Sequence, residues 1–151
     1  MTSLITPDLV RLDADLGADK GAVIHALADV VAQAGRALDV EALVADVLAR
    51  EAKAATCLTG GIAIPHCRTE GVEVPTLVFA RLSPRVDFGA EDGPADLAFL
   101  IAAPAGGDDA HLQILTRLAR ALVRPEFGRD LRGAETADQV IAILGRVVAT
   151  L

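Results

Sequence analysis

The stretch "ADLAFLIAAP", residues 95–104, is an almost unbroken apolar run that ends in proline. Apolar residues that do not alternate with polar ones are typical of a strand buried on both faces. We therefore predict a central strand over Ala95–Pro104. The segments around it must then supply neighbouring strands and the helices that cover both faces of the sheet.

Four further segments have the character of strands, and the segment before the second of them is predicted to be a loop. We predict strands at Leu9–Asp13, Ile62–His66, Thr76–Leu82 and Arg85–Phe88. Pro65 cannot donate a backbone N–H, so the second of these is expected to stop there. The stretch "AKAATCLTGG", residues 52–61, breaks the periodicity and is predicted to be a loop.

Helical periodicity appears on both sides of this strand region. Helices are predicted over residues 18–35, 39–51, 110–123, 125–133 and 136–151, with Asp39 and Thr136 as N-caps. In the helix over 110–123 the apolar face is predicted to comprise Leu112, Leu115, Leu118, Ala119 and Leu122. The fold class is thus α/β: one domain over residues 1–151, with a mixed sheet of about five strands flanked by helices on both faces.

Composition excludes several classes of protein. The chain of 151 residues carries a net charge of −7, has 3% aromatic residues with no Trp or Tyr, and shows no run of Lys or Arg. A nucleic-acid binder normally offers stacking aromatics or a basic patch, so nucleic acid is not an expected partner. No apolar segment approaches the ~18 to 20 residues of a membrane span, so membrane insertion is not expected. The N-terminus lacks the basic and apolar regions of a signal peptide, which predicts a soluble cytoplasmic protein.

The three histidines differ in their surroundings. His25 lies off the apolar face of its predicted helix, with Asp29 four residues on, and is interpreted as a surface residue. His66 follows a buried strand and Pro65, whose ring restricts the backbone, with the flexible pair Gly60 and Gly61 upstream. Two interpretations of His66 stay open on these grounds: catalysis or ligation, and a buried structural histidine.

His111 and Arg50 are also ambiguous. If Asp108 is the N-cap, His111 lies in the first helical turn, where unpaired N–H groups form a natural anion site, but it also aligns with Leu115 as a core-edge residue. Arg50 ends a helix, where a cation is favourable in any case.

A metal site is not expected. Cys57, Cys67, His66 and His111 provide suitable ligand types, but their spacing matches no common zinc pattern, and the cysteines are interpreted as small apolar fillers.

Taken together, these residues resemble a known family over nearly the whole chain. "GIAIPHC" is similar to the active-site signature of the enzyme IIA components of the bacterial phosphoenolpyruvate:sugar phosphotransferase system, fructose/mannitol type (type 2 IIA domain). The resemblance includes Arg50, Glu51 and Thr56, the segment "VDFGAEDGPADLAFLIAAP", and "HLQILTRLARAL" from His111. Thr59 departs from the family pattern, which usually has glycine or alanine there.

The resemblance implies a function and roles for three residues. His66 would accept a phosphoryl group from the phosphocarrier HPr and pass it to a cysteine of a IIB domain during sugar uptake, with fructose favoured over mannitol. His111 would be the second active-site histidine and Arg50 the nearby arginine, with no cofactor and no metal. The IIB and IIC domains would be separate chains or parts of a longer one.

Two other functions remain to be distinguished from this one. A nitrogen-regulatory IIA-like protein would bind partners according to its phosphorylation state, and a pure binding module would leave His66 structural.

Overall fold

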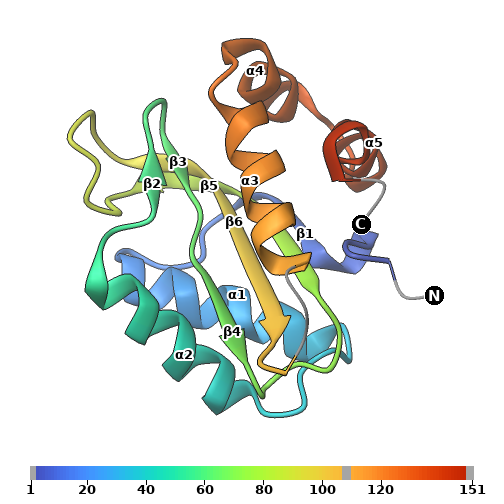
Figure 1. Ribbon diagram of the computed structural model, residues 1–151. Coiled ribbons are helices and arrows are strands. Elements are labelled where there is room, and N and C mark those ends of the chain that lie inside the picture. Colours follow the sequence, from blue (N-terminus) through green and yellow to red (C-terminus); the bar gives the residue numbers. More distant parts are fainter. Residues whose placement is uncertain (1–2, 107–109, 149–151) are drawn as a thin grey trace.

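A mixed sheet between two layers of helices forms the protein in the computed structural model, which describes residues 3–106 and 110–148 (Figure 1). The strands are β1 (Val10–Ala14), β2 (Cys57–Leu58), β3 (Ile62–Ala63), β4 (His66–Thr69), β5 (Thr76–Val86) and β6 (Ala95–Pro104). The helices are the short 3-10 helix η1 (Pro7–Leu9), then α1 (Lys20–Gln33), α2 (Val40–Lys53), α3 (Ala110–Leu122), α4 (Pro125–Gly133) and α5 (Ala137–Val148).

Strand β6 is the centre of the sheet, as predicted, and its bounds match the prediction at both ends. The six strands run in the order β1-β5-β6-β3-β2, with β4 also paired to β6. Strand β6 is antiparallel to β5 and parallel to β3 and β4. Phe79 of β5 and Phe99 of β6 are paired in register, with ring centroids 5.1 Å apart and no solvent exposure. The α/β prediction is confirmed, with six strands where about five were expected.

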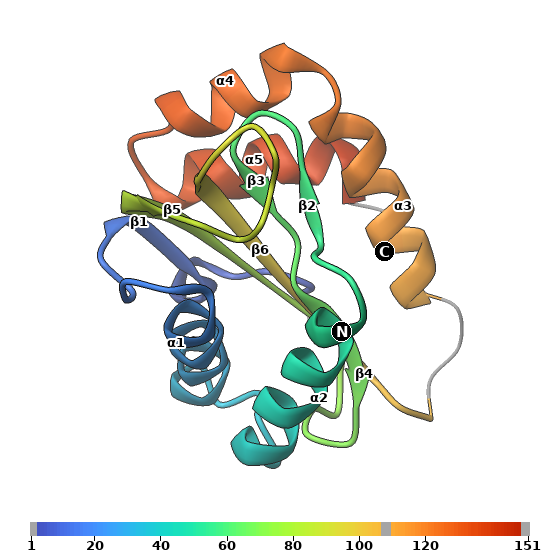
Figure 2. The same cartoon turned by 90° about the vertical axis from the view of Figure 1, so that its left-hand side faces the viewer.

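The helices divide between the two faces of the sheet. Helices α1 and α2 cover one face, and α3, α4 and α5 lie on the other (Figures 1 and 2). Asp39 caps α2 by accepting from the Ala42 amide at 3.1 Å, and Thr136 caps α5 by accepting from the Gln139 amide at 3.2 Å. Both N-cap predictions are confirmed. Among the described residues, none of the helices is long and apolar enough to cross a membrane.

The prediction of a loop over residues 52–61 is wrong at its start and in its middle. Helix α2 continues to Lys53, and Cys57–Leu58 forms β2, which is antiparallel to β3. A strand of two residues is too short to show an alternating pattern, and it is stabilised by its partner rather than by its own sequence.

Two strand boundaries also differ from the predictions. Strand β3 ends at Ala63, and the chain resumes strand structure at His66 beyond Pro65. Pro65 lacks the N–H, but its carbonyl accepts from the Ile101 amide at 3.1 Å, so the chain stays beside β6. The two strands predicted over Thr76–Leu82 and Arg85–Phe88 are one, because β5 continues to Val86 through a shift in register.

The buried face of α3 is rotated from the predicted one. Leu112 is 53% exposed, and the face that packs on the sheet contains Ile114, Leu118, Ala121 and Leu122. Leu118 and Leu122 belong to both the predicted and the observed face, whereas Leu115 and Ala119 are only half-buried.

Candidate functional site

His66 is the first residue of β4, and its position is fixed by β6. It pairs with Ile101 in parallel register, and its side chain is buried, with 8% of its surface exposed. Strand β4 packs against α2 as well as β6. His66 therefore lies on a strand that is held on two sides, where the sequence had placed it at the end of a short buried strand.

The backbone fixes the tautomer of the His66 ring. The Nδ1 atom lies 2.7 Å from the carbonyl oxygen of Ile64. A carbonyl can only accept a hydrogen bond, so Nδ1 carries the proton and Nε2 carries the in-plane lone pair. The nucleophilic atom of this ring is therefore Nε2.

The surroundings of His66 favour the neutral ring. The pKa of His66 is lowered mainly because burial disfavours the imidazolium, and the positive charge of Arg50 lowers it further. The hydrogen bond to Ile64 and the negative charge of Glu51 act in the opposite direction. A free imidazole has a pKa of about 6.5, so His66 keeps its Nε2 lone pair to lower pH than a free histidine.

A pocket of about 490 Å³ opens beside His66 between α2, β4 and α3. Among the residues that line it, three are cations and one is an acid: Arg50, Lys53 and Arg68 against Asp46. Leu112 and Leu115 of α3 form the apolar wall. A buried, neutral nucleophile beside several cations suits a substrate that carries negative charge, such as a phosphoryl group.

Arg50 lies in the last turn of α2 and lines this pocket, near His66 as the family resemblance implied. Its Nη1 atom donates to the carbonyl of Ala54 at 3.3 Å, which holds the guanidinium near the helix end. Lys53 and Arg68 were missed by the sequence analysis. Lys53 follows Arg50 by three residues on the same helix, and Arg68 follows His66 by two on the same strand, so both spacings predict a shared face.

Glu51 supports the segment that connects α2 to β2. Its side chain is buried and accepts from the Thr56 amide at 3.1 Å, from the Thr56 hydroxyl, and from Lys20 Nζ at 3.2 Å. In the sequence, Glu51 stood out only as part of the family pattern. In the structure it connects α1, α2 and the segment before β2, and it lies close enough to His66 to affect its pKa.

We predict that Glu51→Ala lowers the free energy of unfolding by about 2 kcal/mol, because the half-buried Thr56 amide and hydroxyl lose their acceptor. Glu51→Gln keeps an acceptor and should cost about half as much. Urea denaturation followed by circular dichroism measures both. Glu73→Ala, at an exposed position, is the control and should change the value by less than about 0.5 kcal/mol. An unchanged unfolding midpoint for Glu51→Ala would contradict this role.

A second set of polar contacts fixes the turn that leads into β3. Arg132 of α4 donates to both carboxylate oxygens of Asp96, at 2.9 and 2.8 Å, and to the carbonyl of Gly60. Gly60 and Gly61 both have positive φ, which a residue with a side chain rarely adopts. The Asp96 carboxylate and two arginines already fill the space that a Cβ on Gly61 would need. The two glycines thus serve the turn, and Arg132 ties it to α4.

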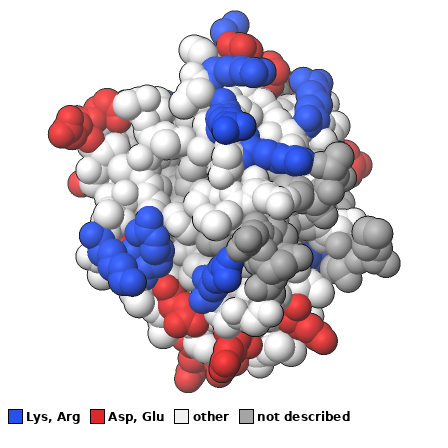
Figure 3. Space-filling model, in the orientation of Figure 1, with Lys and Arg blue, Asp and Glu red and all other residues white. Residues whose placement is uncertain are grey.

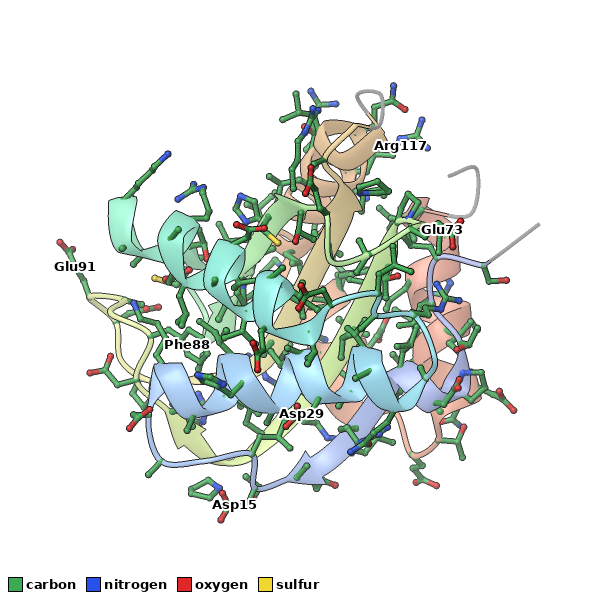
Figure 4. The ribbon with its side chains drawn as sticks, turned by 90° about the horizontal axis from the view of Figure 1, so that it is seen from below. Asp15, Asp29, Glu73, Phe88, Glu91 and Arg117 are labelled. Atoms are coloured by element: carbon green, nitrogen blue, oxygen red, sulfur yellow. The ribbon has the colours of Figure 1, made fainter. Side chains whose placement is uncertain are left out.

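The remaining candidates lie apart from the His66 pocket or outside the described side chains. His25 is exposed on α1, and Asp29 lies on the outward side of the same helix (Figure 4), so the surface interpretation holds for His25. His111 belongs to the first turn of α3, but its side chain and the predicted cap Asp108 lie outside the described residues.

Neither cysteine is a ready nucleophile. Burial, with a contribution from Asp46, raises the pKa of the Cys67 thiol to about 12, and burial also raises the pKa of Cys57. In the part of the chain that the structure describes, no three His, Cys, Asp or Glu side chains are grouped as metal ligands.

Comparison with known proteins shows the family of this chain. Residues 3–147 match the family model "Phosphoenolpyruvate-dependent sugar phosphotransferase system, EIIA 2". The fructose-specific EIIA component of Haloferax volcanii is 40% identical, over 97% of this chain and 96% of its own length.

Two solved structures share the fold. One is the nitrogen regulatory protein IIA-Ntr of Neisseria meningitidis, with a TM-score of 0.84, 29% identity, and coverage of 93% of this chain and 96% of that one. The other is the Escherichia coli complex of the mannitol enzyme IIA with phosphorylated IIB, with a TM-score of 0.78, 25% identity, and coverage of 94% and 97%. The chain therefore belongs to the EIIA 2 family of the phosphoenolpyruvate-dependent sugar phosphotransferase system, a family of phosphotransferase components.

Proposed function

We propose that this protein is a phosphohistidine relay: His66 accepts a phosphoryl group from an HPr-type carrier and passes it to a cysteine of a IIB domain. The observation that carries the proposal is the tautomer of His66, whose Nδ1 is bonded to the Ile64 carbonyl while the ring lines a pocket with three cations. This arrangement leaves the lone pair on Nε2, the attacking atom, and places positive charge beside the oxygens of the incoming phosphoryl group.

Each of the two steps exchanges one bond to phosphorus for another. In loading, His66 Nε2 attacks the phosphorus, the P–N bond of the donor phosphohistidine breaks, and its electron pair returns to the donor ring. In unloading, a IIB thiolate attacks the same phosphorus and the bond to Nε2 breaks. Both steps need in-line approach and neutralised oxygens rather than a metal or cofactor.

Arg50, Lys53 and Arg68 are proposed to share the charge of the phosphoryl oxygens. All three line the His66 pocket. Because the charge is shared, the loss of one cation should slow transfer without abolishing it.

We predict that Arg50→Gln slows loading from phospho-HPr about tenfold, because Lys53 and Arg68 retain part of the stabilisation. The pKa of His66 should also rise, since Arg50 lowers it in the native protein. Rapid-quench measurement of loading and NMR titration of the ring test the two effects separately. Arg50→Lys should recover part of the rate, and Arg129→Gln on the outer side of α4 is the control. Wild-type values for both quantities in Arg50→Gln would exclude this role.

The sugar and the wider role are proposed from relatives. The 40% identity to a fructose-specific EIIA component over almost the full length of both chains favours fructose transport. The likeness to a nitrogen regulatory protein keeps a regulatory function as the second candidate.

A reconstituted relay tests the proposal and separates these candidates. The protein is incubated with phosphoenolpyruvate, enzyme I and HPr, and then with fructose-type or mannitol-type IIB domains. A phosphoryl label that is acid-labile, sits on His66 and is discharged by a fructose-type IIB supports transport. Labelling without discharge to any IIB favours regulation, and no labelling of the folded protein favours a binding module.

A further inference from the structure

A series of hydrogen bonds connects the carboxylate of Glu51 to the ring of His66. Glu51 accepts from the amide of Thr56 at 3.1 Å and from the hydroxyl of the same residue. The carbonyl of Thr56 accepts from the amide of Ile64 at 2.6 Å. The carbonyl of Ile64 accepts in turn from His66 Nδ1 at 2.7 Å. The position of the Glu51 carboxylate therefore bears on the group that keeps the proton on Nδ1.

The link between Thr56 and Ile64 is part of the sheet. It extends the antiparallel pairing of β2 with β3, in which Cys57 lies opposite Ala63. Ile64 is buried, and the next residue, Pro65, is bonded to β6 through its carbonyl. The Ile64 carbonyl is thus positioned from two sides, by Thr56 and by β6. Of these two supports, the one on the Thr56 side depends on a charged group.

Lys20 is the charge partner of Glu51. Only 3% of the Glu51 side chain is exposed, and a buried carboxylate needs partners that replace the water it has lost. Lys20 Nζ, at 3.2 Å, and the two donors of Thr56 are such partners. An ionised carboxylate accepts through both oxygens and donates nothing. The pair with Lys20 therefore suits a fixed acceptor for Thr56.

Loading gives the His66 ring a positive charge. In that step the Nε2 lone pair forms the bond to phosphorus, and the bond between phosphorus and the donor nitrogen breaks, with its electron pair returning to the donor. Nδ1 keeps its proton, which is bonded to the Ile64 carbonyl, so the loaded ring carries a formal positive charge. A nearby negative charge stabilises this state. Glu51 is such a charge, because it raises the pKa of His66 and thus favours a cationic ring.

Glu51 differs in its place from the other charged groups around the ring. Residues of α2 and β4 line the His66 pocket with three cations and one acid, and the lining residues of α3 are apolar: Arg50, Lys53, Arg68 and Asp46, then Leu112 and Leu115. On the face drawn in Figure 3, blue side chains border an uncharged central surface and red ones lie toward the edge of the view. Glu51 is buried and does not line the pocket. The cations thus suit the phosphoryl oxygens, and Glu51 suits the ring.

We infer that Glu51 is a positioning residue of the relay: through Thr56 and Ile64 it holds the His66 ring with its proton on Nδ1, and its charge stabilises the loaded ring. The inference rests on the proposed function, because it concerns the support of His66 as the acceptor. Glu51 acts on the phosphoryl group only through the ring. Its effect on the reaction is therefore separate from its effect on stability.

Two variants separate the charge of Glu51 from the hydrogen bonds of Thr56. Glu51→Gln removes the charge and keeps an acceptor oxygen, whereas Thr56→Val removes the hydroxyl and leaves the charge in place. Thr56→Ser restores a hydroxyl. Glu73→Gln, at an exposed position before β5, makes the same change in charge as Glu51→Gln and is the control.

Each variant is loaded by phospho-HPr and, separately, by the small phosphoryl donor phosphoramidate, which has no protein surface. Rates are compared per folded molecule, with the folded fraction measured by circular dichroism. Nitrogen-15 NMR of the His66 ring reports which nitrogen carries the proton, and its titration gives the pKa.

We expect both donors to load Glu51→Gln about tenfold more slowly than wild type. The pKa of His66 should fall, because Glu51 raises it in the native protein. A lower pKa leaves more of the ring neutral, so protonation of His66 cannot explain slower loading. Part of the ring should instead carry its proton on Nε2. Thr56→Val should show the same change of tautomer with a smaller loss of rate and little change in pKa, and Thr56→Ser should recover both.

Three results would overturn the inference. One is a folded Glu51→Gln that phosphoramidate loads at the wild-type rate with an unchanged ring spectrum, since Glu51 would then serve stability alone. Another is slower loading by phospho-HPr but not by phosphoramidate, which would place the effect at donor binding. If Glu51→Gln does not fold, a wild-type rate and ring spectrum in Thr56→Val decide against it. If neither donor labels His66 in wild type, it is the proposed function that fails.

Discussion

His66→Ala is expected to abolish phosphoryl acceptance, both from phospho-HPr and from phosphoramidate. The lone pair of Nε2 is the proposed attacking group, and the variant has no atom in its place. His66→Gln is the second variant, because its amide can still donate to the Ile64 carbonyl that holds Nδ1 in the native protein at 2.7 Å. It should fold like wild type and remain unlabelled. Intact-protein mass spectrometry measures the label, with acid avoided during sample preparation because the label is acid-labile.

His25→Ala is the matched control, since His25 is exposed on α1, which covers the opposite face of the sheet from α3. It should load at the wild-type rate. If His66→Gln folds and still carries acid-labile phosphate on another residue, then His66 is not the acceptor and its buried ring is structural.

The parts of the fold that could be predicted from sequence are those with a strong local pattern. Ala95–Pro104 is buried along almost its whole length, so its hydrophobicity alone identifies it. Asp39 and Thr136 act within their own helices, and their short polar side chains are sufficient signals. Strand β2, by contrast, has two residues and exists because β3 is beside it.

The residues of the candidate site could be named from the sequence, but the geometry around them could not. "IPH" drew attention to His66, which lines the pocket, but the sequence suggested that Pro65 ends the strand. In the structure the Pro65 carbonyl continues the pairing with β6, and this is what aligns the His66 ring with the Ile64 carbonyl. A local rule about the missing N–H of proline could not reveal what its carbonyl does.

Contacts between distant segments were not accessible from the sequence. Asp96 and Arg132 are 36 residues apart, and no local pattern pairs them before α4 packs beside the β2–β3 turn. The same holds for the three cations that line the His66 pocket. No run of Lys or Arg occurs in the chain, and only folding brings the ends of α2, β4 and α3 to one surface.

Leu112 illustrates how a wrong burial prediction can point to function. Its apolar side chain fits the helical pattern, yet it is 53% exposed at the mouth of the His66 pocket. A leucine left in solvent beside a reactive side chain is better explained by a partner that covers it than by the core. Position 111 directly precedes it, one turn before Leu115, at the start of α3.

His111→Ala should leave loading by phospho-HPr largely intact but slow the handover to IIB about a hundredfold. We propose that His111 donates a hydrogen bond to a phosphoryl oxygen on His66 and is not itself an acceptor. Its place in the first turn of α3 supports this, because helix N-termini favour anions and because Leu112 and Leu115 of the same helix line the His66 pocket. A donor that acts mainly in the transition state is worth on the order of 3 kcal/mol, which sets the size of the effect.

Rapid-quench measurement of the two half-reactions separates these roles of His111. His111→Gln keeps an N–H donor at similar reach, so it should recover part of the handover rate that His111→Ala loses. A purely structural histidine would affect stability and both half-reactions together, and glutamine would not restore one of them selectively. If His111→Ala transfers to IIB at the wild-type rate, His111 is a residue at the edge of the core, and the cations Arg50, Lys53 and Arg68 are left to stabilise the phosphoryl oxygens alone.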